Sequence, residues 1–463
     1  MKANIKVQPI ILAAGKGSRM KSKTSKVLCK IANKPMIGHI LEKTETLSRT
    51  YTLLQSLIVV GYKSEDIIKA FPAKNTSSYK YIEQKEQLGT GHAIKITTNL
   101  IDHDAIVVVL YGDVPLIESE TICSVINAAA DTGFGLLTVK IDNPSGYGRI
   151  IRSEKQIIKI VEQKDASPEE QNINEVNTGI LAAKGADIIR WVDQLSNNNS
   201  QNEYYLTDIV ALAVSEGYQI SSVHPKDEHE VLGANDPKQL AALERAYQLA
   251  QAEKLIAKGA YIADPHRVDI RGKLTIGAEA HIDINTLFEG DVIVGDRVNI
   301  EPNCIIRNST IGNDCQIKAN SYIESATIGN SVSIGPFARI REDSVFGDNS
   351  KIGNFVETKK ATLGKDTKVN HLSYIGDAKL GNKVNIGAGT ITCNYDGKNK
   401  HQTLIEDEVF IGSNSALIAP IKIGKGATVA AGSTLTKEVK KSDLAVGRAN
   451  QKNIQNWKKP KDR

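Results

Sequence analysis

Residues 328–353 read IGNSVSIGPFARIREDSVFGDNSKIG, and an aliphatic or aromatic residue stands directly before glycine at four points of this stretch. These points are six or twelve residues apart. A six-residue period predicts a parallel β-helix, in which each hexapeptide forms one flat strand and three strands complete a coil. The aliphatic side chain then points inward and the glycine stands at the corner.

The same pairing extends to both sides of this stretch, at intervals that cluster at 5 to 6, 11 to 12 and 17 to 18 residues. A chance set of strand-ending glycines would not keep this rhythm. The interval from Gly387 to Gly412 breaks the period, so residues 390–401 are expected to form a loop outside the coil, where function is commonly located. The pairs are Ile276-Gly277, Val294-Gly295, Ile311-Gly312, Ile328-Gly329, Ile334-Gly335, Phe346-Gly347, Ile352-Gly353, Leu363-Gly364, Ile375-Gly376, Leu380-Gly381, Ile386-Gly387, Ile411-Gly412 and Ile423-Gly424.

A different pattern precedes the repeats. Up to about residue 237, apolar β-branched runs at 56–60, 105–110 and 135–140 alternate with helix-length segments, which predicts a mostly parallel sheet covered by helices. Residues 238–258 read as one amphipathic linker helix. The sequence therefore predicts an α/β domain over 1–237, a linker helix over 238–258 and a β-helix domain with a tail over 259–463.

The α/β domain opens with a glycine-rich loop after an apolar strand. Residues 12–26 carry Gly15 and Gly17 together with the cations Lys16, Arg19 and Lys26. Backbone N–H groups of such a loop can close on phosphate oxygens while the cations supply charge. The spacing fits neither a P-loop nor the dinucleotide fingerprint. A simple tight turn would explain the glycines but not the cations.

Composition points to a reduced compartment and small anionic ligands. The 463 residues include five scattered cysteines without metal-ligand spacing, which favours reduced thiols in a cytoplasmic protein. No apolar run approaches the roughly 20 residues of a membrane span. The net charge of +5 is modest and concentrated in the tail 452–463, so phosphorylated small molecules explain the cations as well as nucleic acid does.

Five residues invite a chemical interpretation on their own. Asp113 follows an apolar strand, where ligands bind in open parallel sheets, although a turn aspartate explains it equally well. Arg341 and Lys359 are 18 residues apart and should stack, with an anion between them or as a solvated basic face; Lys359 and Tyr374 should nearly stack. His371 lies in the same region and is either a surface histidine or a general base.

Taken together, several motifs resemble one family over essentially the whole chain: bacterial enzymes that are both N-acetylglucosamine-1-phosphate uridyltransferase and glucosamine-1-phosphate N-acetyltransferase. The resemblance implies a Rossmann-like nucleotidyltransferase domain followed by a left-handed β-helix. The motifs that carry it are Leu12-Ala13-Ala14-Gly15, residues 87–93 (QLGTGHA), 111–116 (YGDVPL), 146–150 (GYGRI), 176–179 (VNTG), 353–357 (GNFVE), 386–397 (IGAGTITCNYDG) and 424–427 (GKGA).

One departure from the family pattern lies in the glycine-rich loop. Similar loops close on Pro-Lys after a leucine, whereas this chain has Thr24-Ser25-Lys26. Serine does not fix φ as proline does, so Lys26 is expected to be less preorganised and triphosphate affinity somewhat lower.

The resemblance implies the residues of a first site, in which a sugar-1-phosphate oxygen attacks the α-phosphorus of UTP. It assigns Mg²⁺ to Asp113 and Asn235, and the triphosphate to Lys26 with Arg19. Uridine contacts are implied for Leu12, Ala13, Ala14, Gly15, Gln84, Gly89 and Thr90. Sugar-nucleotide contacts are implied for Tyr111, Gly112, Gly148, Glu162, Asn177 and Asn235.

A second site is implied for acetyl transfer from acetyl-CoA to the amino sugar phosphate, with His371 as the base. Such sites lie between neighbouring β-helices, so the resemblance implies a homotrimer whose tail around Trp457 packs on or reaches toward a neighbour. Amino-sugar-phosphate contacts are implied for Arg341, Lys359, Tyr374, Asn385 and Lys400, and acetyl-CoA contacts for Ala388, Asn394, Tyr395, Ser413, Ala431 and Arg448.

The predicted function is therefore synthesis of UDP-N-acetylglucosamine for the cell envelope, by acetylation of glucosamine-1-phosphate and then uridyl transfer. One alternative is a sugar-1-phosphate nucleotidyltransferase whose β-helix only oligomerises or regulates. Another is a non-enzymatic scaffold that senses nucleotides. No nucleic-acid partner is expected.

Overall fold

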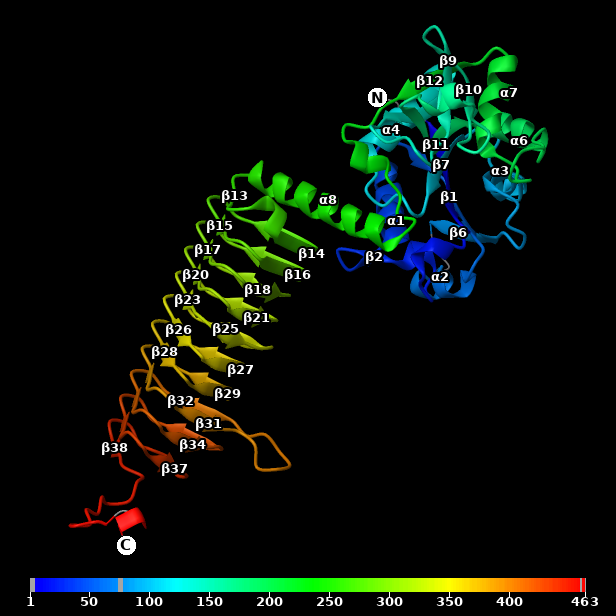
Figure 1. Cartoon of the computed structure of the whole chain (residues 1–463). Helices are drawn as coiled ribbons and strands as arrows, with labels where there is room; N and C mark the ends of the chain where they lie inside the picture. The colour runs from blue at the N-terminus through cyan, green and yellow to red at the C-terminus, as the bar shows by residue number, and fades with distance from the viewer. Residues whose placement is uncertain (1–4, 74–77, 459, 463) are drawn as a thin grey trace. The chain divides into compact units, whose positions relative to one another are not determined.

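In the computed structural model the chain forms two units that divide between Tyr247 and Gln248. The structure describes residues 5–73, 78–458 and 460–462, so positions 459 and 463 of the basic tail lie outside the described residues. None of the helices in these ranges is long and apolar enough to cross a membrane. All five cysteines are free thiols. Each unit is described below by itself (Figure 1).

The first unit is built on a mixed sheet with the strand order β10-β9-β11-β7-β1-β5-β6. Around β1 the pairing is parallel, to β5 and β7, whereas β11 is antiparallel to β7, β8 and β9. Its strands are β1 (Lys6–Ala13), β4 (Thr52–Leu53), β5 (Ser56–Val60), β6 (Tyr79–Glu83), β7 (Ile106–Tyr111), β8 (Gly133–Lys140), β9 (Arg149–Ser153), β10 (Gln156–Val161), β11 (Glu175–Lys184) and β12 (Gln219–Val223), with β2 (Lys30–Ile31) and β3 (Lys34–Pro35) as a separate hairpin.

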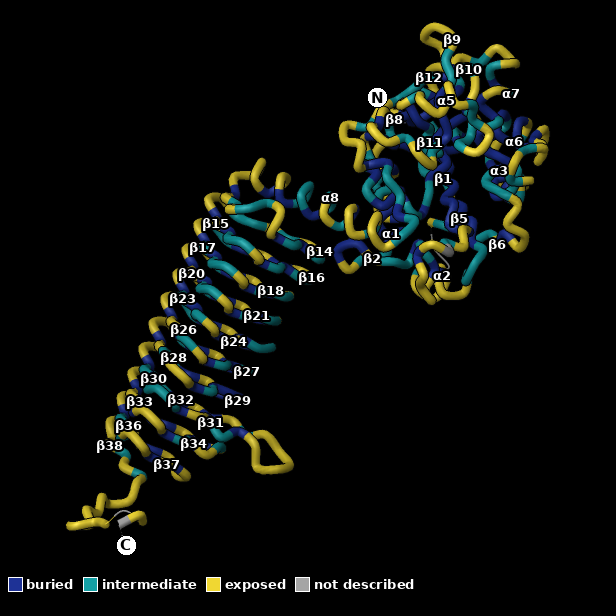
Figure 2. The backbone as a smooth tube through the Cα atoms, viewed as in Figure 1, coloured by how far each residue is buried: buried dark blue, intermediate teal, exposed yellow. Residues whose placement is uncertain are grey.

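Helices cover both faces of this sheet because its central strands are apolar on both sides. Ile11 of β1 packs in one core with residues of α1 and α4, and Ile10 packs in a second core with residues of α3, α6 and α7. The buried central strands are visible in Figure 2. The helices are α1 (Met36–Thr46), α2 (Ser64–Ala70), α3 (Thr90–Lys95), α4 (Ser119–Thr132), α5 (Pro168–Gln171), α6 (Gly185–Asp193), α7 (Ile209–Ser215) and α8 (Pro237–Ile256).

Helix α8 contributes side chains to both units. In its first half, Leu243 packs in a small core of the first unit with Ile31 and Met36. In its second half, Gln248 exchanges two hydrogen bonds with the backbone of Ile270, and Leu255 packs in the core of the second unit.

The second unit is a parallel β-helix, as the hexapeptide rhythm predicts. Consecutive coils pair in parallel at 17 or 18 residue intervals, for example Ile334 with Ile352 and Ile352 with Val369. One sheet contains β13 (Tyr261–Ile262), β15 (His281–Ile282), β17 (Asn299–Ile300), β20 (Gln316–Ile317), β23 (Ser333–Ile334), β26 (Lys351–Asn354), β28 (Lys368–His371), β30 (Asn385–Ile386), β33 (Phe410–Ile411), β36 (Thr428–Val429) and β38 (Leu444–Ala445).

A second sheet of 15 strands forms the remaining faces of the coils. It contains β14 (Val268–Ile276), β16 (Thr286–Val294), β18 (Ile305–Arg307), β19 (Thr310–Ile311), β21 (Tyr322–Glu324), β22 (Ala326–Ile328), β24 (Arg339–Ile340), β25 (Ser344–Phe346), β27 (Glu357–Leu363), β29 (Tyr374–Leu380), β31 (Ile391–Cys393), β32 (Thr403–Ile405), β34 (Ala416–Ile418), β35 (Ile421–Ile423) and β37 (Thr434–Leu435). The aliphatic residues of the repeat fill the interior, and the glycines stand where coils approach closely. A Cβ on Gly364 would lie 2.5 Å from the carbonyl carbon of Gly381.

One corner of the coil holds a column of left-handed residues. In the first coils the column consists of Asn285, Asn303 and Asn320, a residue type that tolerates positive φ. In the next coils it consists of Phe337, Phe355 and Leu372, with φ of 54°, 56° and 49°. These three bulky side chains are 51%, 56% and 62% exposed, and the two phenylalanine rings stack. We call them the apolar corner.

The loop outside the coil begins later than the sequence predicts. Residues 390–393 stay in the coil, because Thr390 is buried and β31 pairs with β29 and β34. Thr392 holds its strand in place by accepting from the Gly376 N–H and donating to the Gly376 carbonyl. The loop is the hairpin from Asn394 to Gln402, closed by a bridge between Tyr395 and Lys400, and it projects from the coils in Figure 1.

Candidate active sites

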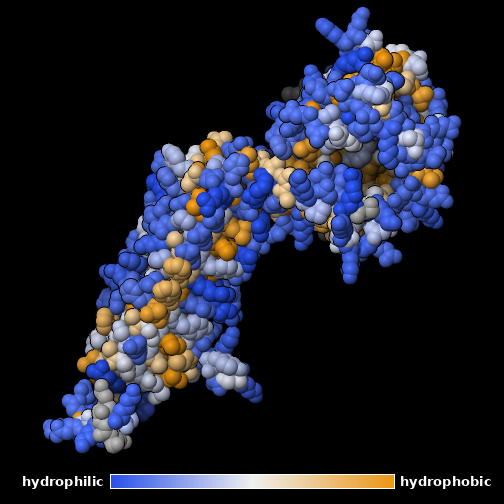
Figure 3. Space-filling view, viewed as in Figure 1, coloured by the Kyte–Doolittle hydropathy of each residue, from blue (hydrophilic) through white to orange (hydrophobic). Residues whose placement is uncertain are grey.

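The glycine-rich loop leaves the end of β1 and lies against Lys26. Leu12, Ala13 and Ala14 are buried while Gly15 is exposed. Gly17 has φ of 58°, and a Cβ there would lie 2.7 Å from Cβ of Lys26. Glycine at this position therefore lets the loop close over the stem of the lysine. Figure 3 shows the face of this unit to be hollowed.

Lys26 joins the two residues predicted to hold magnesium. Its ammonium group makes an ion pair with Asp113 and donates to Asn235 Oδ1 over 2.8 Å. The side chains of Lys26 and Asp113 are only 12% and 19% exposed. Two oxygen donors thus converge on one cationic position. Lys16 and Arg19, by contrast, are exposed on the loop.

The donor set of this position suits a hard divalent cation. Among the residues that the structure describes, no group of three or more His, Cys, Asp and Glu side chains could hold a metal. Mg²⁺ needs few protein ligands when substrate phosphates and water supply the rest, and it prefers oxygen. Asp113 and Asn235, which now share the Lys26 ammonium, meet this requirement.

Ser25, the residue before Lys26, occupies the backbone region that proline would impose. Its φ is −55° and its ψ is 140°. The side chain is fully buried, and its hydroxyl has no hydrogen-bond partner in the described part of the chain. The folded backbone before Lys26 therefore shows no loss of preorganisation. Serine in place of proline would instead act by giving the unfolded chain more conformational freedom.

The predicted uridine contacts lie at the carboxyl ends of β1 and β6 and at the start of α3. Gln84 is buried, and its Nε2 lies 3.1 Å from both the Gly89 carbonyl and His92 Nδ1. Gly89 has φ of 104°, and a Cβ there would lie 2.6 Å from the Tyr204 carbonyl. Thr90 Oγ1 accepts from the Leu206 N–H at 3.2 Å. The polar side chain of Gln84 is thus held in a fixed position.

The predicted sugar contacts form a second group beside Asp113. Tyr111 ends β7, and a Cβ on Gly179 would lie 2.5 Å from its ring. A Cβ on Gly148 would lie 3.5 Å from Glu162 Oε2, and the Asn177 N–H donates to the Gly148 carbonyl at 2.8 Å. Burial, with the carboxylates of Glu162 and Asp113, raises the pKa of Tyr111, so its hydroxyl stays protonated.

Glu162 is a half-buried acid in this group. Burial raises its pKa, while a hydrogen bond of 3.0 Å from Thr207 Oγ1 partly offsets the effect. A half-buried carboxyl with a single hydroxyl donor has unused acceptor capacity. It can therefore accept from a sugar hydroxyl.

In the β-helix, His371 is held by Asn354 of the preceding coil. The two residues pair between β26 and β28, and His371 Nδ1 lies 2.7 Å from Asn354 Oδ1. An amide oxygen can only accept, so the proton resides on Nδ1 and the lone pair of Nε2 is free. The imidazole is exposed, and the next residue is Leu372 of the apolar corner.

Four predicted acetyl-CoA contacts continue the same column beyond His371. The Gly389 N–H donates to the His371 carbonyl, the Asn414 N–H to that of Ala388, and the Gly432 N–H to that of Ser413. Arg448 donates to the Ala431 carbonyl. Ala388, Ser413, Ala431 and Arg448 therefore lie on successive coils in line with the histidine.

Two predicted phosphate-binding cations lie around the corner from His371, and the chain supplies carboxylates to both. Arg341 pairs with Glu357 at 2.8 Å, and Lys359 pairs with Glu342 at 3.2 Å. These carboxylates offset the repulsion between the stacked side chains of Arg341 and Lys359. The stacking of the two cations alone is therefore no evidence for a bound phosphate. The register also pairs Tyr374 with Glu357 rather than with Lys359. Its ring nevertheless covers Gly376, the register partner of Lys359.

The remaining predicted contacts lie on β30 and on the hairpin. Asn385 is half-buried on β30, and Asn394 is buried and donates to Asp377. Tyr395 and Lys400 are exposed on the hairpin, which Asp396 and His401 stabilise through a 2.7 Å contact. Backbone N–H donors of the loop, foremost that of Asn399, together with a hydrogen bond from His401, lower the pKa of Asp396.

Several residues that contact these sites were not predicted as site residues. Gln87 donates to the Ala14 carbonyl at 3.0 Å, and burial with the charge of Asp113 raises the pKa of Tyr147. Glu342, Glu357 and Asn354 surround the second site. For Asn354 a signal existed in the sequence, since it stands 17 residues before His371, one coil away.

Family models match three parts of the chain. A nucleotidyl transferase model matches residues 8–236, a GMPPB C-terminal domain model matches 270–356, and a model of the hexapeptide repeat of succinyl-transferase matches 402–437. The bifunctional protein GlmU of Marinobacter nauticus is 49% identical over 455 residues, which cover 98% of both chains.

Solved structures with similarity cover about half of the chain. A putative glucose-1-phosphate thymidylyltransferase from Bacillus anthracis, in complex with a sucrose, is 21% identical with a TM-score of 0.41, over 51% of this chain and 94% of that one. A UDP-glucose pyrophosphorylase complexed with UDP-glucose is 19% identical with a TM-score of 0.43, over 52% of this chain and 98% of that one.

Proposed function

This chain belongs to the GlmU family of bifunctional uridyltransferases and acetyltransferases, and we propose that its two groups of site residues divide these two reactions between the two units. The enzyme acetylates glucosamine-1-phosphate with acetyl-CoA and transfers UMP from UTP to the product. The observation that carries the assignment of sites is the pair of independent constellations, Lys26 with Asp113 and Asn235, and His371 with Asn354.

In uridyl transfer, the side chains of the first unit bind and orient both substrates. Gln84 with the backbone at Gly89 holds the base, and Glu162 with Asn177 holds the sugar. The phosphate oxygen of N-acetylglucosamine-1-phosphate then attacks the α-phosphorus of UTP and pyrophosphate departs. Lys26 and Arg19 neutralise the charge that develops on the phosphates.

Magnesium fits the oxygen atoms of Asp113 and Asn235. When bound, Mg²⁺ would screen the phosphates and align them for in-line attack. The Lys26 ammonium, which Asp113 and Asn235 share in this structure, then becomes free for the triphosphate. Asp113 and Lys26 are thus complementary charges that separate when substrate arrives.

In acetyl transfer, His371 Nε2 takes a proton from the amine as the amine attacks the thioester carbonyl. CoA leaves as the thiol once it regains a proton, and the amide bond replaces the thioester bond. Asn354 keeps the neutral imidazole in the tautomer that this step needs. Arg341, Lys359, Tyr374, Asn385 and Lys400 would hold the sugar phosphate.

Four of the six acetyl-CoA contacts belong to one column, and we propose that a neighbouring chain completes this site. The apolar corner supports a homotrimer, because Phe337, Phe355 and Leu372 expose large side chains in a backbone region that bulky residues avoid. His371 directly precedes Leu372, so assembly through this corner would bring a second chain beside the base. The hairpin residues Asn394 and Tyr395, with Arg448 and the tail around Trp457, would then contact CoA or the neighbour.

We further propose that the enzyme works in the cytoplasm, where its free thiols stay reduced. Its partners are then small molecules and two further copies of itself. Its product would supply cell-wall synthesis.

One assay tests the proposed function. The full chain is incubated with glucosamine-1-phosphate, acetyl-CoA, UTP and Mg²⁺, and the release of CoA thiol and pyrophosphate is followed with the formation of UDP-N-acetylglucosamine. All three products are expected. Pyrophosphate release only from supplied N-acetylglucosamine-1-phosphate would favour a nucleotidyltransferase with a structural β-helix.

A further inference from the structure

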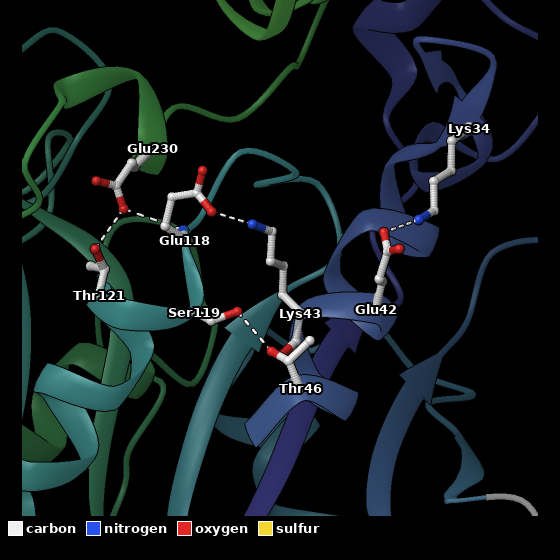
Figure 4. A network of polar contacts seen from close by, with 8 residues as sticks. All are labelled: Lys34, Glu42, Lys43, Thr46, Glu118, Ser119, Thr121 and Glu230. Atoms are coloured by element: carbon white, nitrogen blue, oxygen red, sulfur yellow. Dashed lines mark hydrogen bonds and ion pairs between the residues drawn. The ribbon is translucent and has the colours of Figure 1, made fainter. Parts of the chain in front are cut away.

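Glu230 is a buried carboxylate in the first unit that the proposed mechanism does not use. It is 6% exposed and lies in the short 3-10 helix Glu228–Val231. Its Oε2 accepts from Thr121 Oγ1 at 2.6 Å and from the Glu118 N–H at 3.3 Å, and its Oε1 accepts from the Lys226 N–H at 3.1 Å. Figure 4 shows it pointing at the start of α4.

The contacts of Glu230 join two segments that are far apart in sequence. Glu118 stands at the N-terminal cap of α4, and its own side chain makes no capping bond but pairs with Lys43 of α1. Glu230 accepts from the N–H of this cap residue although it is more than a hundred residues away in the sequence. An acidic group is favourable at this end of a helix because of the helix dipole.

These two segments carry the two proposed magnesium ligands. Residues 112–118 run from the end of β7 through Asp113 to the start of α4, and residues 230–235 run from Glu230 to Asn235. Near Asp113 they touch again: the Ala234 N–H donates to the Asp113 carbonyl at 3.4 Å, and a Cβ on Gly233 would lie 3.3 Å from that oxygen.

Packing between the two contact points leaves little freedom. Val231 is buried in the same core as Val114 and Ile117, and Ala234 is fully buried beside Ile31. The 230–235 segment is therefore fixed at one end by Glu230 and at the other by Asn235 and Lys26. A shift at the first end moves the second.

We propose that Glu230 is a positioning residue, which sets the separation of Asp113 and Asn235 by fastening the 230–235 segment to the N-terminus of α4. This inference rests on the proposed function, since it assumes that Asp113 and Asn235 hold Mg²⁺. Residues that orient metal ligands typically change metal affinity or activity by about 10- to 100-fold when mutated.

The test measures Mn²⁺ binding to the full chain by electron paramagnetic resonance, with UDP-N-acetylglucosamine present. Glu230→Gln keeps the shape but presents an NH₂ group to one of the two sides that need an acceptor. It should weaken Mn²⁺ binding by about 10- to 100-fold. Uridyl transfer should then require more Mg²⁺ and approach the wild-type kcat at saturation. The matched control is Glu228→Gln, the same change on an exposed residue of the same short helix, which should bind Mn²⁺ normally.

Two further variants keep the outcome decisive. Thr121→Val removes the 2.6 Å donor without changing the carboxylate and should weaken Mn²⁺ binding in the same direction, so it decides the matter if Glu230→Gln does not fold. Acetyl transfer by the same samples reports on folded protein. Asp113→Asn tests the metal site itself.

The possible results separate the two claims. Loss of Mn²⁺ binding in Asp113→Asn, with normal binding in folded Glu230→Gln and Thr121→Val, would overturn the positioning role alone. Normal binding in Asp113→Asn would overturn the proposed metal site and, with it, this inference.

Discussion

Asn354 and His371 lie one coil apart in the β-helix, and 2.7 Å separates Asn354 Oδ1 from His371 Nδ1. Because the amide oxygen fixes the tautomer, Asn354→Leu should lower acetyl transfer, by less than the roughly 10²- to 10⁴-fold that loss of the base itself costs. Asn354→Asp should shift the acidic limb of the kcat/KM profile to higher pH, since a carboxylate raises the pKa of a neighbouring imidazole. Unchanged profiles in both variants would contradict the role of Asn354.

His371→Ala should abolish acetyl transfer and spare uridyl transfer. Removal of a positioned base costs about 10²- to 10⁴-fold. The two activities are measured separately, as CoA thiol release and as pyrophosphate release from supplied N-acetylglucosamine-1-phosphate. His281→Ala serves as the control, because His281 is exposed on β15 of the same sheet, five strands before the β28 strand that carries His371. A parallel loss of both activities in folded His371→Ala would refute two independent sites.

Ser25→Pro should stabilise the first unit and strengthen UTP binding. The observed φ of −55° suits proline, and the substitution removes a buried hydroxyl without a partner among the described residues. Substitutions of this kind stabilise by about 0.4–1 kcal/mol through the unfolded chain. Thermal unfolding and the KM for UTP are the measurements. A lower melting temperature would mean that proline does not fit at residue 25.

A mixture of His371→Ala and Arg448→Gln chains should recover acetyl transfer if the site is shared between chains. Each variant alone lacks one component, the base or the charge near CoA, and a charge-assisted contact is worth roughly 1.5–3 kcal/mol. The chains are refolded together and hetero-trimers are verified by mass. Uridyl transfer should stay constant throughout. An inactive mixture that contains hetero-trimers would indicate that both residues act from one chain.

Glu162→Gln should raise the melting temperature at neutral pH while weakening UDP-N-acetylglucosamine binding. Burial raises the folded pKa of Glu162 above its unfolded value, so its ionisation destabilises the fold increasingly as the pH rises from the unfolded to the folded pKa, and fully above the folded pKa. The difference in melting temperature should therefore shrink as the pH falls toward about 4.3, the ordinary value for glutamate. Thermal scans between pH 4 and pH 8, with exposed Glu154→Gln as the control, measure it. A constant difference across this range would exclude ionisation as the cause.

The architecture of the β-helix could be predicted because its glycine spacing records the coil length directly. The start of the hairpin could not, since Thr390 and Thr392 read as polar loop residues but satisfy their hydroxyls inside the coil. In the first unit, apolar runs located the strands but not their direction. A strand buried on both faces, such as β11, has the same composition whether its pairing is parallel or antiparallel.

The candidate sites were predictable where a motif or a glycine marks them. Some side chains that act on other side chains carry no such mark: Glu342 pairs with Lys359, and Glu230 accepts from a residue more than a hundred positions away. Such partners are identified only from the folded structure.

The two units also differ in the sequence separation between their paired strands. In the first unit β1 pairs with β7, so Val7 meets Ile106, whereas most coils of the β-helix pair with the one made 17 or 18 residues earlier. Contacts between distant residues slow folding, and short-range contacts allow it to propagate stepwise. On the ribosome the β-helix can therefore add one coil at a time as it emerges. In the first unit, by contrast, the sheet and the proposed metal ligands are complete only after β12 and Glu230 have been synthesised.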